Sequence, residues 1–492
     1  METVRTNGGC GKHFRTALTL LAICLFTAAG AQPRVLTLEE CRNLALKNNK
    51  LIKVADESII GADYLHKAAK TAYLPGVDFG MTYFYNQHKI ALLGEDAKLP
   101  TMTFDPATQS YQYNLVKNPM TGEPIKDPQT GSFIPSEVAV IPKSAMEYDI
   151  HNVVAGAITL TQPVYMGGAI RAMDGITHYA SEIARASRNA AVQDVVYNVD
   201  EAYWLVVSLK EKCKLADSFV CLMDTFLYNV NAMYTEGVAT QKDVLTVQVN
   251  QNQASIARVK VQNGLSLARM ALNQMCGLPI DDVYELADGN LADEPTTMPP
   301  FSYNMQDVYA NRQDLKALGH SISMFEQKEK LALSALLPKL AIVGAYSFSN
   351  PNTIDGFEKR FGGGFSIGAT LTVPLWHWGG NTNRYKAAKT ATNVQRLLLD
   401  EAREKVNLQV NQAKFKYEEA YKTYRMTLEN QKKADENLRQ AQLAYREGLL
   451  TPDDVVAAQT AWVQAQSERI DAQIGIELCN TYLSKVLGNL KY

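Results

Sequence analysis

One ten-residue stretch occurs twice in this chain, and it limits the possible folds more than any other feature. Glu447–Val456 reads EGLLTPDDVV, and Glu236–Leu245 reads EGVATQKDVL. In each copy a glycine can end an incoming helix in the left-handed conformation, and a threonine three residues later can cap an outgoing helix. An aspartate three residues after the threonine completes a capping box. The stretch therefore predicts two tight turns, each joining a pair of antiparallel helices.

The two turns belong to a longer internal repeat with a constant offset. Gly448 minus Gly237 is 211, and the same offset relates Leu160–Pro163 to Leu371–Pro374. Self-similarity at a fixed offset indicates one structural unit used twice. We expect a first repeat at 32–277, an acidic and proline-bearing linker at 278–304, and a second repeat at 305–492.

The first 31 residues have the pattern of a secretory signal. Lys12 and Arg15 precede an apolar run, and Ala29-Gly30-Ala31 is a small-x-small cleavage site. No later apolar run is long enough for a transmembrane helix, so we expect that this exported chain enters a membrane only with strands. The formal net charge of −2 and the lack of a basic stripe argue against a nucleic-acid partner.

Five cysteines follow the signal, and their spacing offers no disulfide framework. No CxxC pair is present, and two of the five, Cys213 and Cys221, are expected on one helix, too far apart to bridge. An odd number without a framework favours buried thiols. The others are Cys41, Cys276 and Cys479.

Each repeat is predicted to run helix, two strands, long helix, turn, helix. In the first repeat the helix covers about 37–73, the strands about 77–86 and 150–163, and a proline-bearing loop 88–148 lies between them. The next helix reaches Tyr234, and at about 1.5 Å per residue it is about 100 Å long. In the second repeat the first helix covers about 305–336, and strands follow near 340–348 and 365–373.

The long helices carry a heptad seam, the signature of coiled-coil packing. The spacing alternates between four and three residues and recurs at the 211-residue offset. The first seam is Ala202, Val206, Leu209, Cys213, Ala216, Val220, Met223, Leu227, Val230 and Tyr234; the second is Ala413, Tyr417, Ala420, Tyr424, Thr427, Gln431, Ala434, Leu438, Ala441 and Tyr445.

The four strands alternate apolar with small or polar residues, as the wall of a membrane barrel requires. Val77, Phe79 and Met81 alternate with Asp78 and Gly80, for example. Four strands cannot close a barrel, for which eight is the usual minimum, and open edges are not tolerated in lipid. We therefore expect several copies of the chain to combine their strands, with the long helices projecting as a tube.

Over nearly its whole mature length the chain resembles the TolC-like outer-membrane efflux protein family. The matching motifs are Leu36–Glu40 with Asn48-Asn49, Gln162–Gly168, Arg312–Leu315 leading to Pro338, and the two Gly-x-x-Thr-x-x-Asp-Val turns. The resemblance implies a mainly α-helical homotrimer with a 12-stranded β-barrel in the outer membrane and an α-helical periplasmic tunnel. It implies a passive exit duct of a tripartite efflux or type I secretion system, without cofactors.

The same resemblance assigns expected roles to the two turns. In the family the hairpin tips meet a periplasmic adaptor protein, which links the duct to an inner-membrane transporter. The matching positions are Gly237, Thr240, Gly448 and Thr451. The competing interpretation is that these are only turn and cap residues, and both interpretations can hold together.

Asp243 and Asp454 match positions near the family's periplasmic aperture, where rings of carboxylates favour cations. The capping box explains the same residues without a gate. Leu450 and Ala457 are uncharged where some relatives carry charges, which argues against a charge lock in the closed state.

Trp376 and Trp378 are two residues apart just after the last expected strand, so in an extended chain their side chains would lie on the same side. Paired aromatic residues at the end of membrane strands are typical of the membrane–water boundary. A place in the protein core is the alternative, and the boundary is favoured because four outward-apolar strands end nearby.

Two other classes of protein are alternatives to this interpretation. The six histidines of the mature chain show no metal-ligand spacing, and no nucleophile elbow or phosphate loop is present, so an enzyme is disfavoured. A periplasmic coiled-coil protein that never enters a membrane is the stronger alternative. The sequence does not specify the cargo, the identity of the pump, the resting state of the channel or the role of loop 88–148.

Overall fold

The computed structural model describes residues 35–288, 298–299, 302–354, 356 and 358–490. The expected signal segment, 1–31, and part of the expected linker lie outside the described residues. The chain divides into two units. A helical unit is formed from Met1–His66, Gly175–Gln327 and Ala388–Tyr492, and a second unit, which contains the main sheet, from Lys67–Asp174 and Lys328–Ala387.

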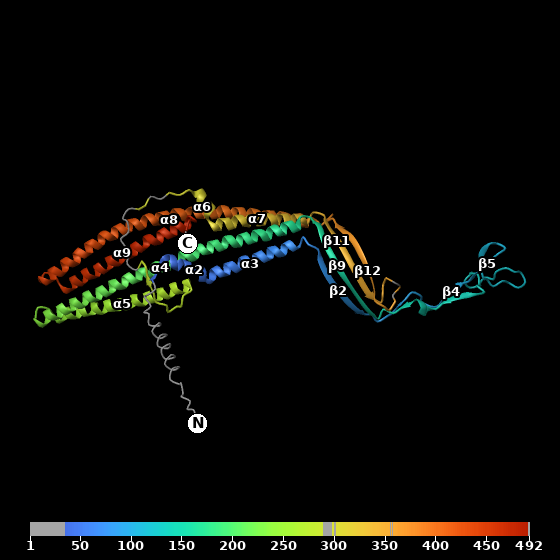
Figure 1. Cartoon of the computed structure of the whole chain (residues 1–492), viewed down its shortest axis with the longest axis horizontal. Coiled ribbons are helices and arrows are strands. Elements are labelled where there is room, and N and C mark those ends of the chain that lie inside the picture. Colours follow the sequence, from blue (N-terminus) through green and yellow to red (C-terminus); the bar gives the residue numbers. More distant parts are fainter. Residues whose placement is uncertain (1–34, 289–297, 300–301, 355, 357, 491–492) are drawn as a thin grey trace, which may run out of the picture. The chain divides into compact units, whose positions relative to one another are not determined.

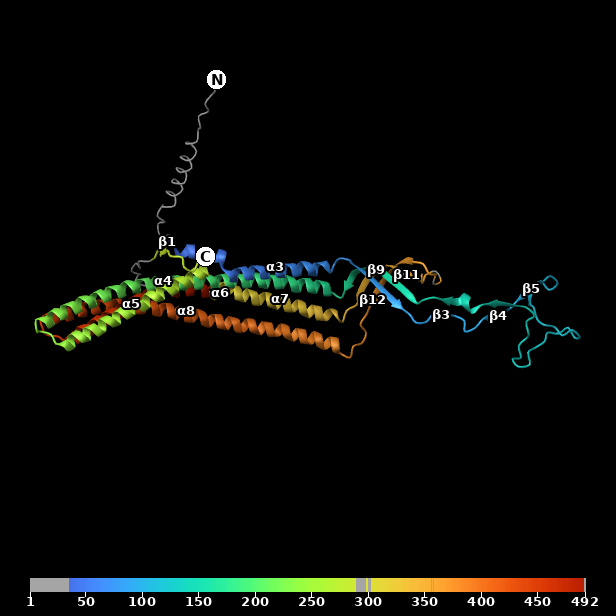
Figure 2. The same ribbon diagram turned by 90° about the horizontal axis from the view of Figure 1, so that it is seen from below.

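Four long helices account for a little less than half of the described residues. They are α4 (Ala169–Thr235), α5 (Gln241–Cys276), α8 (Gly380–Arg446) and α9 (Pro452–Val486). Helices α4 and α8 are each 67 residues long, or about 100 Å. The α4–α5 and α8–α9 hairpins lie side by side, and their turns lie at the same end of the helical unit (Figure 1, Figure 2).

The first helix of each expected repeat is broken, and the expectation of one continuous helix is wrong in both. The first break separates α2 (Leu38–Asn48) from α3 (Lys50–Thr71), and the second separates α6 (Met305–Asn311) from α7 (Gln313–Ser334). At the first break Asn49 has an extended backbone, and its side-chain oxygen accepts a hydrogen bond from Leu51 N at 2.8 Å. Asn49 thereby starts α3 as an N-cap residue does.

Arg312 makes the second break. Its backbone is extended, and its guanidinium donates hydrogen bonds to the carboxylate of Asp314 and to the carbonyl oxygen of Val486. A contact that spans 174 residues sets this bend, which explains why the local helical periodicity did not reveal it.

The predicted heptad seams form the interior of the helical hairpins. In α8 every seam residue from Ala413 to Tyr445 is buried or half-buried, and Tyr424 is fully buried. In α4 the seam is also covered from Ala202 to Val230, but Tyr234, next to the turn, is 47% exposed. The seam prediction is therefore confirmed except at its last residue in α4.

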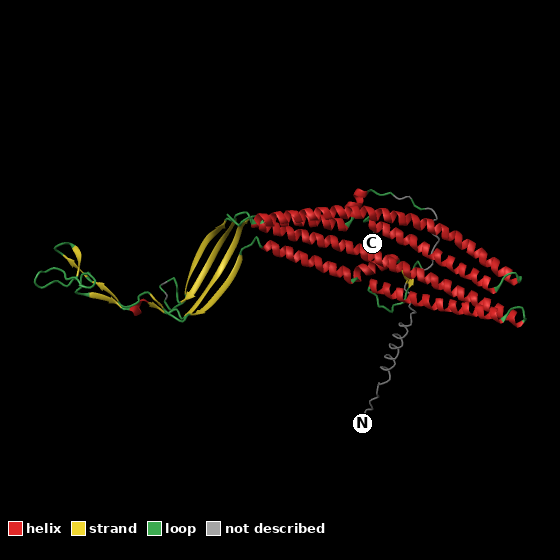
Figure 3. Cartoon of the chain, turned by 180° about the vertical axis from the view of Figure 1, so that it is seen from behind, coloured by secondary structure: helices red, strands yellow, loops and turns green. Residues whose placement is uncertain are grey.

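A four-stranded antiparallel sheet dominates the second unit (Figure 3). Its strands are β2 (Gly76–Tyr85), β9 (Asn152–Met166), β11 (Lys339–Asn350) and β12 (Gly362–Thr372), in the order β12-β11-β9-β2. Strand β9 continues past Pro163, where the sequence suggested an end. Pro163 is tolerated because the pairing with β2 stops at Thr161, and Val164 is the extra residue of a bulge opposite β11.

Strand register places most of the large apolar residues of the four strands on one face of the sheet. Directly paired residues share a face, and one row of pairs crosses all four strands through Phe79, Ile158, Tyr346 and Phe365. The neighbouring row, on the opposite face, is Asp78, Thr159, Ala345 and Ser366. The predicted alternation is confirmed, and it extends over the whole sheet.

The segment 88–148 is more ordered than the expected loop. It contains β3 (Ile90–Ala91), β4 (Ala97–Pro100), β5 (Met102–Asp105), β6 (Ser110–Tyr113), β7 (Val138–Ile141), the short helix η1 (Lys143–Met146) and β8 (Glu147–Tyr148). These strands form three two-stranded ladders: β3 with β8, β4 with β7, and β5 with β6. The segment also contains three Asx-Pro turns, at Asp105, Asn118 and Asp127, and in each the Asx oxygen accepts a backbone N–H two residues on.

A two-stranded parallel ladder, β1 (Val35–Leu36) with β10 (Glu285–Leu286), joins the start of the described chain to the expected linker. All five mature cysteines are thiols, and Cys41 and Cys276 are fully buried. Cys221 is exposed, so the expectation of buried thiols is wrong for that residue.

None of the helices in the described part of the chain is both long enough and apolar enough to cross a membrane.

Candidate functional site

The turn between α4 and α5 is built by a glycine and a complete capping box. Gly237 has a φ of +78°, where a side chain is strained, and Val238 N donates to Met233 O at 2.8 Å. Thr240 caps α5: its backbone N–H and its hydroxyl both donate to Asp243 Oδ2, at 2.8 and 2.7 Å. Asp243 N donates back to the Thr240 hydroxyl at 3.3 Å. Both predicted capping partners are confirmed at this tip.

The turn between α8 and α9 repeats this bonding. Gly448 has a φ of +75°, and Leu449 N donates to Ala444 O at 2.8 Å. The backbone N–H and hydroxyl of Thr451 donate to Asp454 Oδ2 at 2.9 and 2.6 Å. Pro452 occupies the first turn of α9, where its missing N–H costs nothing. The two tips are therefore chemically equivalent at the backbone level.

Hydrogen bonding holds the pKa of both tip carboxyls below the ordinary value. For Asp243 the largest cause is the backbone N–H of Thr240, and for Asp454 it is the hydroxyl of Thr451. Both tip carboxylates therefore remain charged at neutral pH while they cap their helices. Their charge is available to act on ions near the tips, which leaves the aperture hypothesis and the capping role compatible.

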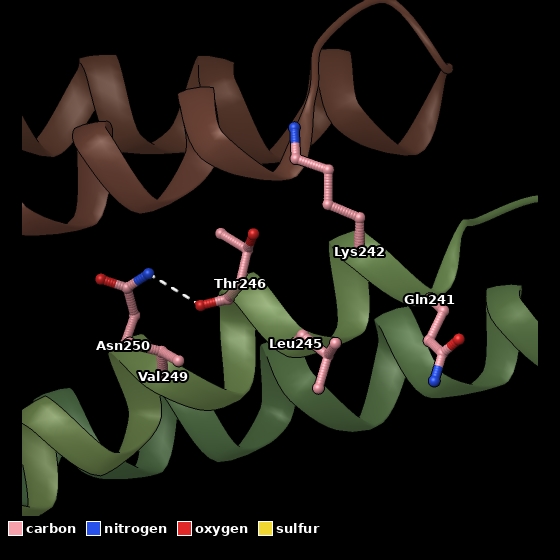
Figure 4. A pocket seen from close by; sticks show the side chains of 6 residues that line it. All are labelled: Gln241, Lys242, Leu245, Thr246, Val249 and Asn250. Carbon is pink, nitrogen blue, oxygen red and sulfur yellow. Dashed lines mark hydrogen bonds between the residues drawn. The ribbon is translucent and has the colours of Figure 1, made fainter.

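A face of α5 next to the first tip carries exposed apolar side chains. A shallow pocket of about 520 Å³ there is lined only by residues of α5, so it has one wall (Figure 4). The exposed large apolar residues on α5 are Leu245, Val249, Ile256, Val259, Leu267 and Met270. Several are spaced three or four residues apart, the spacing of a helix face that packs against another helix. We call these six residues the α5 apolar face.

Trp376 and Trp378 lie between β12 and α8, and their side chains are 72% and 88% exposed. The rings meet edge to face, with centroids 5.8 Å apart. Near the end of β9 Tyr165 is 48% exposed, and Tyr73, before β2, is 46% exposed. Sequence reasoning missed these two tyrosines, although each lies next to a strand end, as the tryptophans do.

The α5 apolar face was also missed. Its signal was present in the sequence as a second stripe of large residues along 241–276. In the part of the chain that the structure describes, no group of three or more His, Cys, Asp or Glu side chains is arranged to hold a metal ion.

Comparison with known proteins gives a consistent result. A family model described as outer membrane efflux protein matches residues 143–278 and 304–489. The outer membrane channel CmeC of Campylobacter jejuni is 15% identical, with 92% of this chain and 86% of that chain covered and a TM-score of 0.67.

Two further solved structures agree to a similar degree. The outer membrane protein VceC of Vibrio cholerae is 14% identical over 92% of this chain and 96% of its own, with a TM-score of 0.67. The open-state MtrE outer membrane channel of Neisseria gonorrhoeae is 16% identical over 92% and 89%, also with a TM-score of 0.67. At these identities the likeness concerns the fold. No curated protein matches the sequence.

Proposed function

The chain belongs to the outer membrane efflux protein family, and from this premise we propose that three copies assemble into one exit duct. The protein acts in the outer membrane as the exit channel of an efflux system, a passive conduit and not an enzyme. The proposal concerns its assembly, the way it is positioned in lipid, and the proteins to which it docks.

The observation that carries the proposal is an open sheet with one lipid-compatible face. Large apolar side chains on that face are 40–71% exposed in the single chain: Val77, Phe79, Met81, Tyr83, Ile158, Leu160, Ile342, Tyr346, Phe365, Ile367 and Leu371. A contiguous apolar surface of this kind marks contact with lipid or with another protein. The opposite face is mostly small and polar, with exceptions such as Phe84 and Val343, which suits the lumen of a water-filled barrel.

The two edge strands explain why one chain is not enough. Strands β2 and β12 form the edges of the sheet, and each leaves a row of backbone groups unpaired in lipid, at several kcal/mol per group. Because successive strands are antiparallel, β2 and β12 run in opposite directions, and β2 of one copy can extend β12 of the next. Three copies of four strands give a closed barrel of twelve.

The α5 apolar face supports the same assembly in the helical part. A pocket with a single helical wall needs a second wall, and a neighbouring copy would supply it. Helices α4 and α8, each about 100 Å long, would then form the wall of a periplasmic tunnel. This arrangement rests on the two repeats expected from the sequence, 32–277 and 305–492, with 278–304 as the linker.

We assign the two tips to docking, as the family resemblance implies. In this proposal Gly237, Thr240, Gly448 and Thr451 form the periplasmic end that contacts an adaptor protein, and the adaptor connects the duct to an inner-membrane transporter. Asp243 and Asp454 lie close to that end and would line its aperture. Trp376 and Trp378 would lie at the membrane–water boundary on the periplasmic side.

The test is the native mass of the complex extracted in mild detergent from outer-membrane fractions. A trimer is the expected result. A monomer in the outer membrane would leave four strands with open edges and would contradict the shared barrel. Release of the protein by a salt wash would favour the rival class, a periplasmic coiled coil outside the membrane.

A further inference from the structure

We propose that Cys41 and Cys276 form a disulfide bond in the exported protein, which fastens α2 to the end of α5. This inference goes beyond the exit-duct function and depends on it only for the compartment. A protein of the outer membrane reaches its site through an oxidising compartment, where disulfides form and persist.

The fold brings the two cysteines together from positions 235 residues apart. Cys41 lies in the first turn of α2, where its N–H donates to Thr37 O at 3.0 Å. Cys276 is the last residue of α5, and its Sγ lies 3.6 Å from the carbonyl oxygen of Cys41. Both cysteines are completely buried in one hydrophobic core.

Neighbouring contacts fix the two helices closely at this point. Asn48 Nδ2 donates to Cys276 O at 3.0 Å. Gly277, with a φ of +70°, caps α5, and a Cβ added there would lie 2.4 Å from Asn48 Cβ. A larger residue at 277 would push the helices apart. The backbone around the thiols is therefore held in one arrangement, which favours a specific bond over random pairing.

The surroundings separate this pair from the other three cysteines. Tyr284 lies in the same buried core cluster as Cys41 and Cys276, and burial, followed by the two thiols, raises the pKa of its hydroxyl. The pKa of Cys276 is lowered, chiefly by the hydrogen bond with Cys41, while burial acts against this. By contrast, burial raises the pKa of both Cys213 and Cys479.

The bond would form by two thiol–disulfide exchanges with a disulfide-bearing oxidant of the exported compartment. The Cys276 thiolate attacks a sulfur of the oxidant and releases one of its thiols. The Cys41 thiolate then attacks Sγ of Cys276 in this mixed disulfide and releases the second thiol. In total the two protein thiols lose two protons and two electrons, and the oxidant's disulfide gains them. Because both residues are buried in the folded protein, the exchange must precede docking of α2 on α5.

The experiment is thiol counting and peptide mapping on the full-length protein purified from membranes. The protein is denatured, alkylated without reductant and digested. We expect alkylation of three cysteines (Cys213, Cys221 and Cys479) and a linked species that joins the peptide Val35–Arg42 to the peptide containing Cys276. After reduction all five cysteines should be alkylated.

Matched variants complete the test. Cys213→Ser should lower the number of alkylated cysteines by one and leave the linked peptide in place. Cys41→Ser should abolish the linked peptide and make Cys276 alkylatable without reductant. Alkylation of all five cysteines in the unreduced wild-type protein, with no linked peptide, would overturn the proposal while leaving the exit-duct function untouched.

Discussion

The two hairpin tips are nearly identical, whereas the helices that lead away from them differ. Thr240 with Asp243 and Thr451 with Asp454 make the same three hydrogen bonds at the same spacing. Beyond the turn, α5 exposes six large apolar side chains, and α9 exposes none. Val249 on α5, for example, corresponds at the 211-residue offset to the exposed but polar Thr460 on α9.

This difference distinguishes the features that the two hairpins share from those that differ between them. The turn is constrained by backbone chemistry, so both copies retain glycine, threonine and aspartate. The helix surface is constrained by its neighbours, and those differ for α5 and α9. Within one chain the exposed residues of α9 are small or polar, whereas those of α5 include large apolar side chains, which is why we assign α5 to contact with another copy.

The largest expected effect comes from a charge on the α5 apolar face. Val249→Glu should prevent stable trimers, because a carboxylate buried without a partner costs about 3–5 kcal/mol. Thr460→Glu, at the corresponding position on α9, should leave trimers intact. Size-exclusion chromatography with light scattering in detergent measures both. If both variants formed trimers, or if neither did, the proposed difference between α5 and α9 in trimer contact would be contradicted.

A second pair of substitutions compares the packing of the heptad seams in α8 and α4. Tyr424 in α8 is fully buried, and its counterpart in α4 is the half-buried Cys213. Tyr424→Ala should destabilise the protein by about 3–5 kcal/mol because it leaves a large cavity. Cys213→Ala should cost less than about 1 kcal/mol, since a single sulfur atom is removed from a partly exposed site. Thermal unfolding followed by circular dichroism compares them; similar losses would mean that the two seams pack equally.

Two substitutions at Gly448 distinguish the effect of side-chain size at the tip from the effect of backbone strain. At Gly448 the φ of +75° strains any side chain by about 1–2 kcal/mol, and nothing lies within 4 Å of an added Cβ. Gly448→Ala therefore adds strain with little bulk, and Gly448→Phe adds both. If the tip docks on an adaptor, the Phe variant should lose efflux while trimers still assemble, and the Ala variant should retain it. Normal efflux by the Phe variant would contradict docking at this tip.

The smallest expected stability effect concerns the tip carboxylates. Changing Asp243 and Asp454 together to Asn keeps a hydrogen-bond acceptor at each cap, so stability should fall only slightly. If the two residues line the aperture, cation selectivity in planar bilayers should also fall. Asp453→Asn, which removes a charge outside the capping pair, serves as the control. Unchanged selectivity in the double variant would leave only the capping role.

The pH dependence of the tips has a defined sign. The pKa of each tip carboxyl is lower in the folded protein, so each contributes stability that is present above the ordinary carboxyl pKa of about 3.9. That contribution is lost as the pH falls through the lowered pKa. Cation selectivity that depends on these carboxylates should therefore persist at pH 5 and disappear only below about pH 4. Loss of selectivity near pH 6 would point to other groups.

Features controlled by local chemistry were predictable from the sequence. The capping boxes at Thr240 and Thr451, and the alternation along β2, β11 and β12, follow from neighbouring residues and were found. The break at Arg312 depends on a hydrogen bond to the carbonyl oxygen of Val486. The short ladders within 88–148 depend on pairing between strands as many as 58 residues apart. Such contacts leave little trace in local periodicity. The aperture and docking assignments involve other molecules, and they remain predictions.

The most direct test of the shared barrel is a disulfide between its edge strands. A cysteine at Thr82 in β2 would be combined in turn with cysteines at Gly364, Ser366 and Gly368 in β12, with Cys221→Ser to remove the exposed native thiol. Within one chain β2 and β12 are three strand spacings apart, roughly 14 Å, which is beyond the reach of a disulfide. Our account predicts that at least one combination gives linked dimers and trimers on a non-reducing gel, with no larger species. Monomers for every combination, or a ladder that continues beyond three, would contradict a barrel made from three copies of this sheet.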